Sequence, residues 1–147
     1  VLAASLLAVR ARPAGTTEWK PIVEQRTVRT TISASGSRCF VGVRGARHLI
    51  THLDGSDVVP VTLSGVWCSI GHERGFFAWT DYKVIDIGFD GTTRATEITK
   101  DQEAADRGLF RAGDDVFFVK ARWLFRYRAG TWTKHDIGAA GAQIGLG

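Results

Sequence analysis

Residues 82–91 read YKVIDIGFDG, in which β-branched residues lead into an Asp-Gly pair. Two other stretches share this plan, ARHLITHLDG at 46–55 and ARWLFRYRAG at 121–130, and the three align without a gap. Short runs of β-branched and aromatic residues that end at Gly-centred turns are typical of strands joined in hairpins. Each stretch is therefore predicted to be a strand that enters a tight turn.

The Asp-Gly pair predicts a two-residue turn of type I′, because Asp and Gly both tolerate the positive φ angles that this turn requires. A further strand is predicted before each of these stretches, at 38–43 (RCFVGV), 75–80 (GFFAWT) and 115–120 (DVFFVK). Residues 27–35 and 65–70 are candidates for a fourth strand of their units.

This unit recurs about every 38 residues, if an incomplete first copy with its turn at Gly15 is counted. Three or four antiparallel strands cannot bury their own faces, so the units must stack on one another. Helical periodicity is scarce in the chain. The one predicted helix covers 100–107 (KDQEAADR), between a capping residue at Thr99 and a stop at Gly108, and it is short enough to be a connector.

The repeats resemble the blades of β-propellers, of the group whose repeats end in an Asp-Gly-Thr-x-Trp-type hairpin. The segments that carry this resemblance are GTTEW at 15–19, LDGSDV at 53–58, FDGTT at 89–93 and RYRAGTW at 126–132. The resemblance implies a single all-β domain over residues 1–147, with three blades and a partial first one, whereas complete propellers have at least four. Other copies of the chain, or the rest of a longer chain, would then complete the ring. The alternative architecture is a small β-barrel or sandwich.

The composition is that of a globular domain, with 147 residues of which 44% are hydrophobic and 23% charged. The net charge of +4 is small for a nucleic-acid-binding protein, so we expect no nucleic-acid partner. No apolar run reaches the roughly 20 residues of a membrane span. The sequence contains no methionine, which suggests a processed product or a piece of a longer chain. The compartment stays open, with an extracellular or cell-surface location favoured.

Two sets of reactive side chains have a structural explanation that is simpler than a chemical one. His48 and His52 share one face of a predicted strand, but their positions are apolar in the other repeats, so we predict packing rather than a metal site. Cys68, His72 and Glu73 supply a thiol, a base and a carboxylate, yet a loop between two strands accounts for them equally well.

The remaining candidates also point away from catalysis. Asp114 and Asp115 are explained by a turn that begins a strand, and no phosphate-binding loop, nucleophile elbow or dinucleotide fingerprint occurs. We therefore predict no catalytic residue, no metal and no cofactor. Cys39 and Cys68 form either one disulfide or two separate buried thiols.

The densest set of charged and aromatic side chains lies in the predicted C-terminal hairpin. Arginine beside aromatic rings suits stacking on sugars, bases or acidic groups, and the alternative is an ordinary solvated face. The residues of this set are Lys120, Arg122, Trp123, Arg126, Tyr127, Arg128, Trp132, Lys134 and His135.

We predict a non-enzymatic binding module that recognises a glycan or a protein, because stacked repeats present similar shallow sites side by side. One alternative is a structural or assembly component, including a homo-oligomer. The other is a hydrolase that uses clustered carboxylates such as Asp81, Asp86 and Asp90. The predicted ligand contacts are Trp19, Trp79, Tyr82, Trp123, Arg126 and Trp132.

Overall fold

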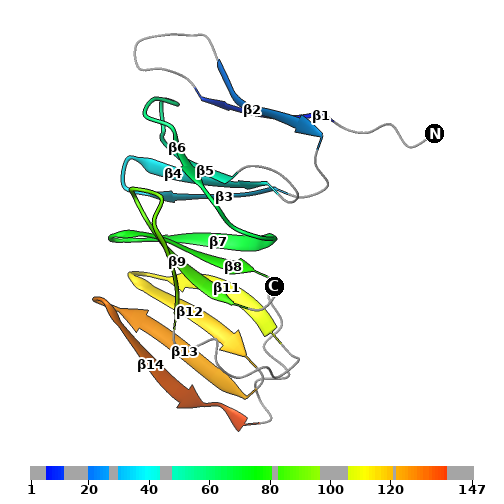
Figure 1. Cartoon of the computed structure of the whole chain (residues 1–147). Helices are drawn as coiled ribbons and strands as arrows, with labels where there is room; N and C mark the ends of the chain where they lie inside the picture. The colour runs from blue at the N-terminus through cyan, green and yellow to red at the C-terminus, as the bar shows by residue number, and fades with distance from the viewer. Residues whose placement is uncertain are drawn as a thin grey trace, which may run out of the picture.

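The computed structural model describes residues 6–11, 20–26, 30–43, 48–80, 83–96, 106–120 and 122–138, which form strands and turns without an α-helix. Three four-stranded antiparallel sheets follow one another along the chain, and Figure 1 shows them stacked in a column. Within each sheet the strands lie in sequence order. The prediction of an all-β chain of stacked antiparallel repeats is therefore confirmed.

Sheet 1 contains β3 (Thr30–Ser35), β4 (Arg38–Val43), β5 (His48–His52) and β6 (Val59–Val61). Sheet 2 contains β7 (Val66–His72), β8 (Gly75–Thr80), β9 (Val84–Gly88) and β10 (Thr93–Ala95). Sheet 3 contains β11 (Asp106–Ala112), β12 (Asp115–Lys120), β13 (Trp123–Arg128) and β14 (Thr131–Asp136). The incomplete first repeat is a separate antiparallel pair of strands, β1 (Leu6–Ala11) and β2 (Lys20–Arg26).

The predicted helix at 100–107 is wrong at its C-terminal end, and its residues before Asp106 lie outside the described part of the chain. Asp106 begins β11 and pairs with Lys120 of β12, and Leu109 of the same strand pairs with Phe118. This pairing places Leu109 of β11 against sheet 2. Burial in the sheet outweighs a local helical preference, which is worth only a fraction of a kcal/mol for each residue.

The Asp-Gly turns of sheets 1 and 2 are not the predicted two-residue turns. In sheet 2 the Gly91 amide donates to the Gly88 carbonyl at 3.0 Å, and the Gly88 amide donates to the Thr92 carbonyl at 2.9 Å. This pattern is a three-residue loop with a glycine of positive φ at its end, and Gly91 has φ 83°. Asp90 keeps a negative φ because its carboxylate accepts bonds from the amide and hydroxyl of Thr92.

Sheet 3 makes the two-residue turn, although it lacks the Asp. Ala129 and Gly130 both have positive φ, 48° and 83°, and Arg128 pairs with Thr131 on either side of them. The turn of sheet 3 is therefore one residue shorter than the turns that contain an Asp.

That missing residue makes the gap-free alignment wrong for sheet 3. A shift of one residue moves every side chain of a strand to the other face of the sheet. Ile50 of β5 and Val84 of β9 face the sheet that follows, whereas Phe125 and Tyr127 of β13 face back toward sheet 2. The side chains of Trp123, Phe125 and Tyr127 therefore pack on sheet 2.

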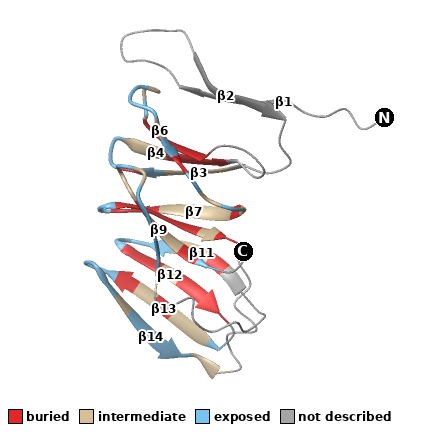
Figure 2. Ribbon diagram, viewed as in Figure 1, coloured by how far each residue is buried: buried red, intermediate tan, exposed pale blue. Residues whose placement is uncertain are grey.

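Two apolar clusters fill the spaces between the sheets. Cluster 1 lies between sheets 1 and 2 and includes Phe40, Ile50 and Phe76; cluster 2 lies between sheets 2 and 3 and includes Phe77 and Phe118. The alternation of β8 supplies both, since Phe76 and Phe77 are each fully buried. Burial contributes about 1.5–3 kcal/mol for such a side chain, and the buried residues in Figure 2 lie mainly in the middle strands.

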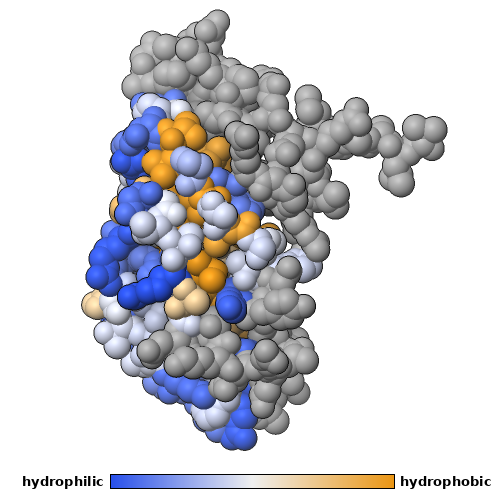
Figure 3. All heavy atoms as spheres, viewed as in Figure 1, coloured by the Kyte–Doolittle hydropathy of each residue, from blue (hydrophilic) through white to orange (hydrophobic). Residues whose placement is uncertain are grey.

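The outer rim of the stack changes character from sheet 1 to sheet 3. In Figure 3 hydrophobic side chains gather over the boundary between sheets 1 and 2, whereas the visible part of sheet 3 is largely hydrophilic. Val59, Leu63 and Phe89 pack against cluster 1 while partly exposed, and Leu53 and Val58 are among the exposed large hydrophobic residues. The rim is apolar beside cluster 1.

Candidate functional site

A cleft opens between sheets 2 and 3 where their outer strands diverge. Its volume is about 460 Å³, and an adjoining hollow along sheet 2 shares Arg74, Asp86 and Arg94 with it. On one side the lining residues come from the β7–β8 turn, the middle of β9, and β10 with the residue after it, and on the other side they come from the β13–β14 hairpin. They are Arg74, Asp86, Arg94, Ala95, Thr96, Tyr127, Gly130, Thr131 and Trp132.

The register of sheet 2 explains why this part of the boundary is charged. One row of paired residues runs across the four strands as Ile70, Phe77, Asp86 and Arg94, and all four belong to the face toward sheet 3. The two inner residues are apolar and pack on cluster 2. The two outer residues are charged, so the sheets cannot close on one another there at low cost.

Asp86 is fixed in position by a buried histidine. His72 Nε2 lies 3.1 Å from Asp86 Oδ1, and the His72 side chain is 2% exposed against 32% for Asp86. The ring stacks on Phe77 at 4.1 Å between centroids. Its Nδ1 accepts a hydrogen bond from the Arg74 amide at 3.4 Å, which leaves Nε2 to donate to the carboxylate. Asp86 therefore presents its other oxygen to the cleft.

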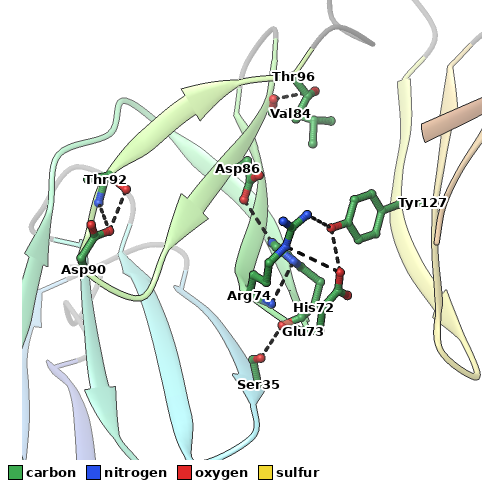
Figure 4. Close-up of polar contacts among 10 residues, drawn as sticks. All are labelled: Ser35, His72, Glu73, Arg74, Val84, Asp86, Asp90, Thr92, Thr96 and Tyr127. Carbon is green, nitrogen blue, oxygen red and sulfur yellow. Dashed lines mark hydrogen bonds and ion pairs between the residues drawn. The ribbon is translucent and has the colours of Figure 1, made fainter. Parts of the chain in front are cut away.

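A polar bridge joins the two sheets at the inner side of the cleft (Figure 4). The Tyr127 hydroxyl donates to Glu73 Oε1 at 3.0 Å and accepts from Arg74 Nη2 at 3.3 Å. Burial raises the pKa of Tyr127. Burial opposes ionisation of Glu73, but its hydrogen bonds, from its own amide and from Tyr127, and the charge of Arg74 hold its pKa below the usual range. The bridge thus fixes one guanidinium of the cleft.

The opposite wall is the indole of Trp132, which is half-buried. Its ring lies 5.1 Å from Phe77 and 5.3 Å from Tyr127, centroid to centroid, so the neighbours on both sheets fix its position. Trp132 pairs directly with Tyr127 across β13 and β14. The cleft thus combines a flat aromatic surface, one carboxylate and two guanidinium groups in a preformed arrangement.

No protein-family model and no curated protein matches this chain. Among solved structures, it is similar to one described as "YCF48 bound to D1 peptide", with a TM-score of 0.51 and 14% sequence identity. The match covers 83% of this chain and 46% of the other. The fold is propeller-like. The chain spans about half the length of that propeller, and at this identity the likeness shows the fold alone.

In this propeller-like arrangement the four predicted ligand contacts that the structure describes do not form one surface. Trp132 packs against cluster 2 and also lines the cleft, whereas Trp79 and Trp123 pack against cluster 2 only. Arg126 points from the other face of sheet 3, where its Nε donates to Asp115 Oδ2 at 2.8 Å. Trp19 and Tyr82 lie outside the described residues.

The other reactive side chains of the sequence are engaged in local structure. His48 Nε2 lies 3.1 Å from the Leu63 carbonyl and its ring stacks on Phe40, and burial lowers the pKa of this histidine. His52 lies 3.7 Å from Asp57. Within the described residues, no group of three or more His, Cys, Asp or Glu is placed to hold a metal ion.

The candidates for covalent or acid–base chemistry have similar explanations. Cys39 and Cys68 are both free thiols, and burial raises the pKa of each. Asp90 caps a turn and Asp115 pairs with two arginines. Asp81 lies outside the described residues. Across the described part of the chain, no helix is long and apolar enough to span a membrane.

Sequence reasoning missed Arg74 and Arg94 as site residues. The predicted two-residue turn hid Arg94, because that turn would place Arg94 opposite Ile87, whereas the three-residue loop places it opposite Asp86. Arg74 gave no sequence signal, since its position depends on a tyrosine from another sheet.

Proposed function

We propose that the protein is a non-enzymatic binding module that takes a segment of a partner protein into the cleft between sheets 2 and 3. The observation that carries this proposal is the cleft itself, in which Trp132 packs on rings of both sheets and the exposed Arg74 donates a hydrogen bond to Tyr127 of the other sheet. Rigid aromatic and arginine side chains at the centre of a concave surface are the usual anchors of protein recognition.

The similar solved structure gives independent support, because that propeller is described as bound to a peptide. A peptide enters a groove of this kind as an extended segment, with its main chain bonded to a strand edge and its side chains in adjacent pockets. The cleft has a strand edge on each side, β10 and β14. A glycan stacked on Trp132 is the competing ligand class.

Parallel screens of a peptide array and a glycan array test the proposal. We expect the intact chain to bind peptides, and Trp132→Ala to abolish that binding. Trp67→Ala is the matched control. Like Trp132, Trp67 is half-buried, but it packs on Trp79 and lies outside the cleft. Circular dichroism would show whether each variant keeps its fold. Binding to glycans alone, or peptide binding that survives Trp132→Ala, would contradict the proposal.

A further inference from the structure

We propose that the cleft selects acidic segments: an Asp or Glu carboxylate of the partner binds Arg94 while the main chain of the partner pairs with the outer edge of β10, which has no neighbouring strand in the described part of the chain. This inference rests on the proposed function, and it adds the charge of the partner and the strand that it joins.

Arg94 is an exposed charge of the cleft that has no protein partner in the described part of the chain. Among arginines whose side chains the structure describes, it alone makes neither a hydrogen bond nor an ion pair. It lies opposite Asp86 in the register, yet no ion pair joins the two side chains. The partners of the others are Asp57 for Arg38, Glu73 and Tyr127 for Arg74, backbone carbonyls for Arg111, Asp136 for Arg122, and Asp115 for Arg126 and Arg128.

The local charges favour an incoming anion. Arg74 and Arg94 both line the cleft and its adjoining hollow, and among the described lining residues they face one carboxylate, that of Asp86. His72 already takes one oxygen of that carboxylate. Glu73, next to Arg74 in the chain, is engaged by the Tyr127 hydroxyl. A guanidinium binds a carboxylate through two parallel hydrogen bonds, which makes this group the natural counterpart of Arg94.

The backbone of β10 offers the rest of the contact. The Thr92 carbonyl and the Thr96 amide both bond to β9. Backbone groups of an antiparallel strand alternate in direction, so the amides and carbonyls of Thr93 and Ala95 point away from the sheet. Both residues are exposed, and β10 is the last strand of its sheet. An extended segment can therefore add to this edge with its side chains beside Arg94.

The test is a titration with two labelled peptides, both amidated at the C-terminus. One alternates Glu and Thr, and the other alternates Gln and Thr. Fluorescence polarisation, with the labelled peptide held at low concentration and the protein raised to about 1 mM, covers weak binding. We expect binding of the Glu peptide that weakens with added salt, and no more than a tenth of that affinity, by rough estimate, for the Gln peptide.

Arg94→Gln is expected to weaken Glu-peptide binding about tenfold, the size of one charge-assisted contact. Arg122→Gln is the matched control, because Arg122 is also exposed and follows β12 at the opposite end of sheet 3. A Glu preference that survives Arg94→Gln would overturn the assignment. Stronger binding of the same peptide with a free C-terminus would assign the contact to the terminal carboxylate instead.

Two further outcomes separate this inference from the proposed function. Equal binding of the two peptides, still lost in Trp132→Ala, would refute the acidic preference and leave the peptide-binding role intact. Binding of an acidic oligosaccharide but of neither peptide would overturn both.

Discussion

The boundary between sheets 1 and 2 and the boundary between sheets 2 and 3 are alike at their middle strands and differ at their outer strands. In sheet 1 the row that faces sheet 2 contains Phe40, Ile50 and Val59, and it is apolar out to the rim. The same row of sheet 2 continues from Phe77 into Asp86 and Arg94. Two outer residues therefore decide whether a boundary closes as core or opens as a cleft.

The polar contacts at the two boundaries differ in the same way. Between sheets 1 and 2, the hydroxyls of Thr31 and Ser69 bond to each other at 3.0 Å, and Ser35 donates to the His72 carbonyl. Between sheets 2 and 3 the corresponding bridge joins the charged side chains of Glu73 and Arg74 through the neutral hydroxyl of Tyr127. Short neutral side chains accompany the closed boundary, whereas a carboxylate and a guanidinium accompany the open boundary.

The largest expected effect is that of Ile50→Asp, which places a carboxylate in the closed boundary. Ile50 is fully buried, so the change both removes apolar burial and forces a charge into the core. We expect a loss of more than about 4 kcal/mol of unfolding free energy in urea titrations followed by tryptophan fluorescence. Asp86→Asn at the equivalent position of sheet 2 should cost less than about 1.5 kcal/mol. Similar losses of unfolding free energy in the two variants would refute the contrast between a closed and an open boundary.

The next largest effect compares the inner parts of the two boundaries. Phe40→Ala and Phe77→Ala should each cost about 3–5 kcal/mol, because both rings are fully buried at equivalent positions. The same urea titrations measure both. A much smaller cost for Phe77→Ala would mean that the cleft reaches into cluster 2.

Tyr127→Phe is expected to have a smaller effect. It keeps the ring packed on Phe77 but removes the hydroxyl that joins Glu73 and Arg74, for a loss of about 1–2 kcal/mol. A double-mutant cycle with Glu73→Gln isolates the bond between the two side chains. If the two changes were strictly additive, the bridge would not couple the sheets.

The smallest expected effect is that of Glu73→Gln on the pH dependence of thermal stability. Because the pKa of Glu73 is lowered in the folded chain, its contribution to stability is present above its unfolded pKa, about 4.3, and disappears as the pH falls through the folded value. Glu73→Gln should therefore reduce the loss of thermal stability between neutral and acidic pH. An unchanged acid profile in that variant would show that Glu73 gains nothing from the bridge.

The sequence predicted the strands and the stacking well, because both depend on local patterns. Strands such as 75–80 alternate between two buried faces, and their β-branched and aromatic content identifies them directly. The turns were harder. Asp54 and Asp90 favour a three-residue loop through their own carboxylates, and only sheet 3, with Ala129, makes the turn predicted for Asp-Gly.

The site was less predictable, because it depends on which face each residue occupies. The shorter turn of sheet 3 turns Tyr127 toward sheet 2 and Arg126 away from it, opposite to what the gap-free alignment implies. The bridge between Arg74 and Tyr127 joins residues of different repeats, which no local pattern encodes.

Homo-oligomerisation stays a prediction. Light scattering should give a molar mass that is a multiple of 16.0 kDa, and a monomer would contradict the prediction.

The double variant Asp86→Ile/Arg94→Val tests most directly whether the two outer residues create the binding cleft. It gives sheet 2 the outer residues of sheet 1, Ile50 and Val59. We predict that the variant keeps its β-sheet circular dichroism and binds no peptide that the unmodified chain binds. A folded variant with unchanged peptide binding would contradict the account.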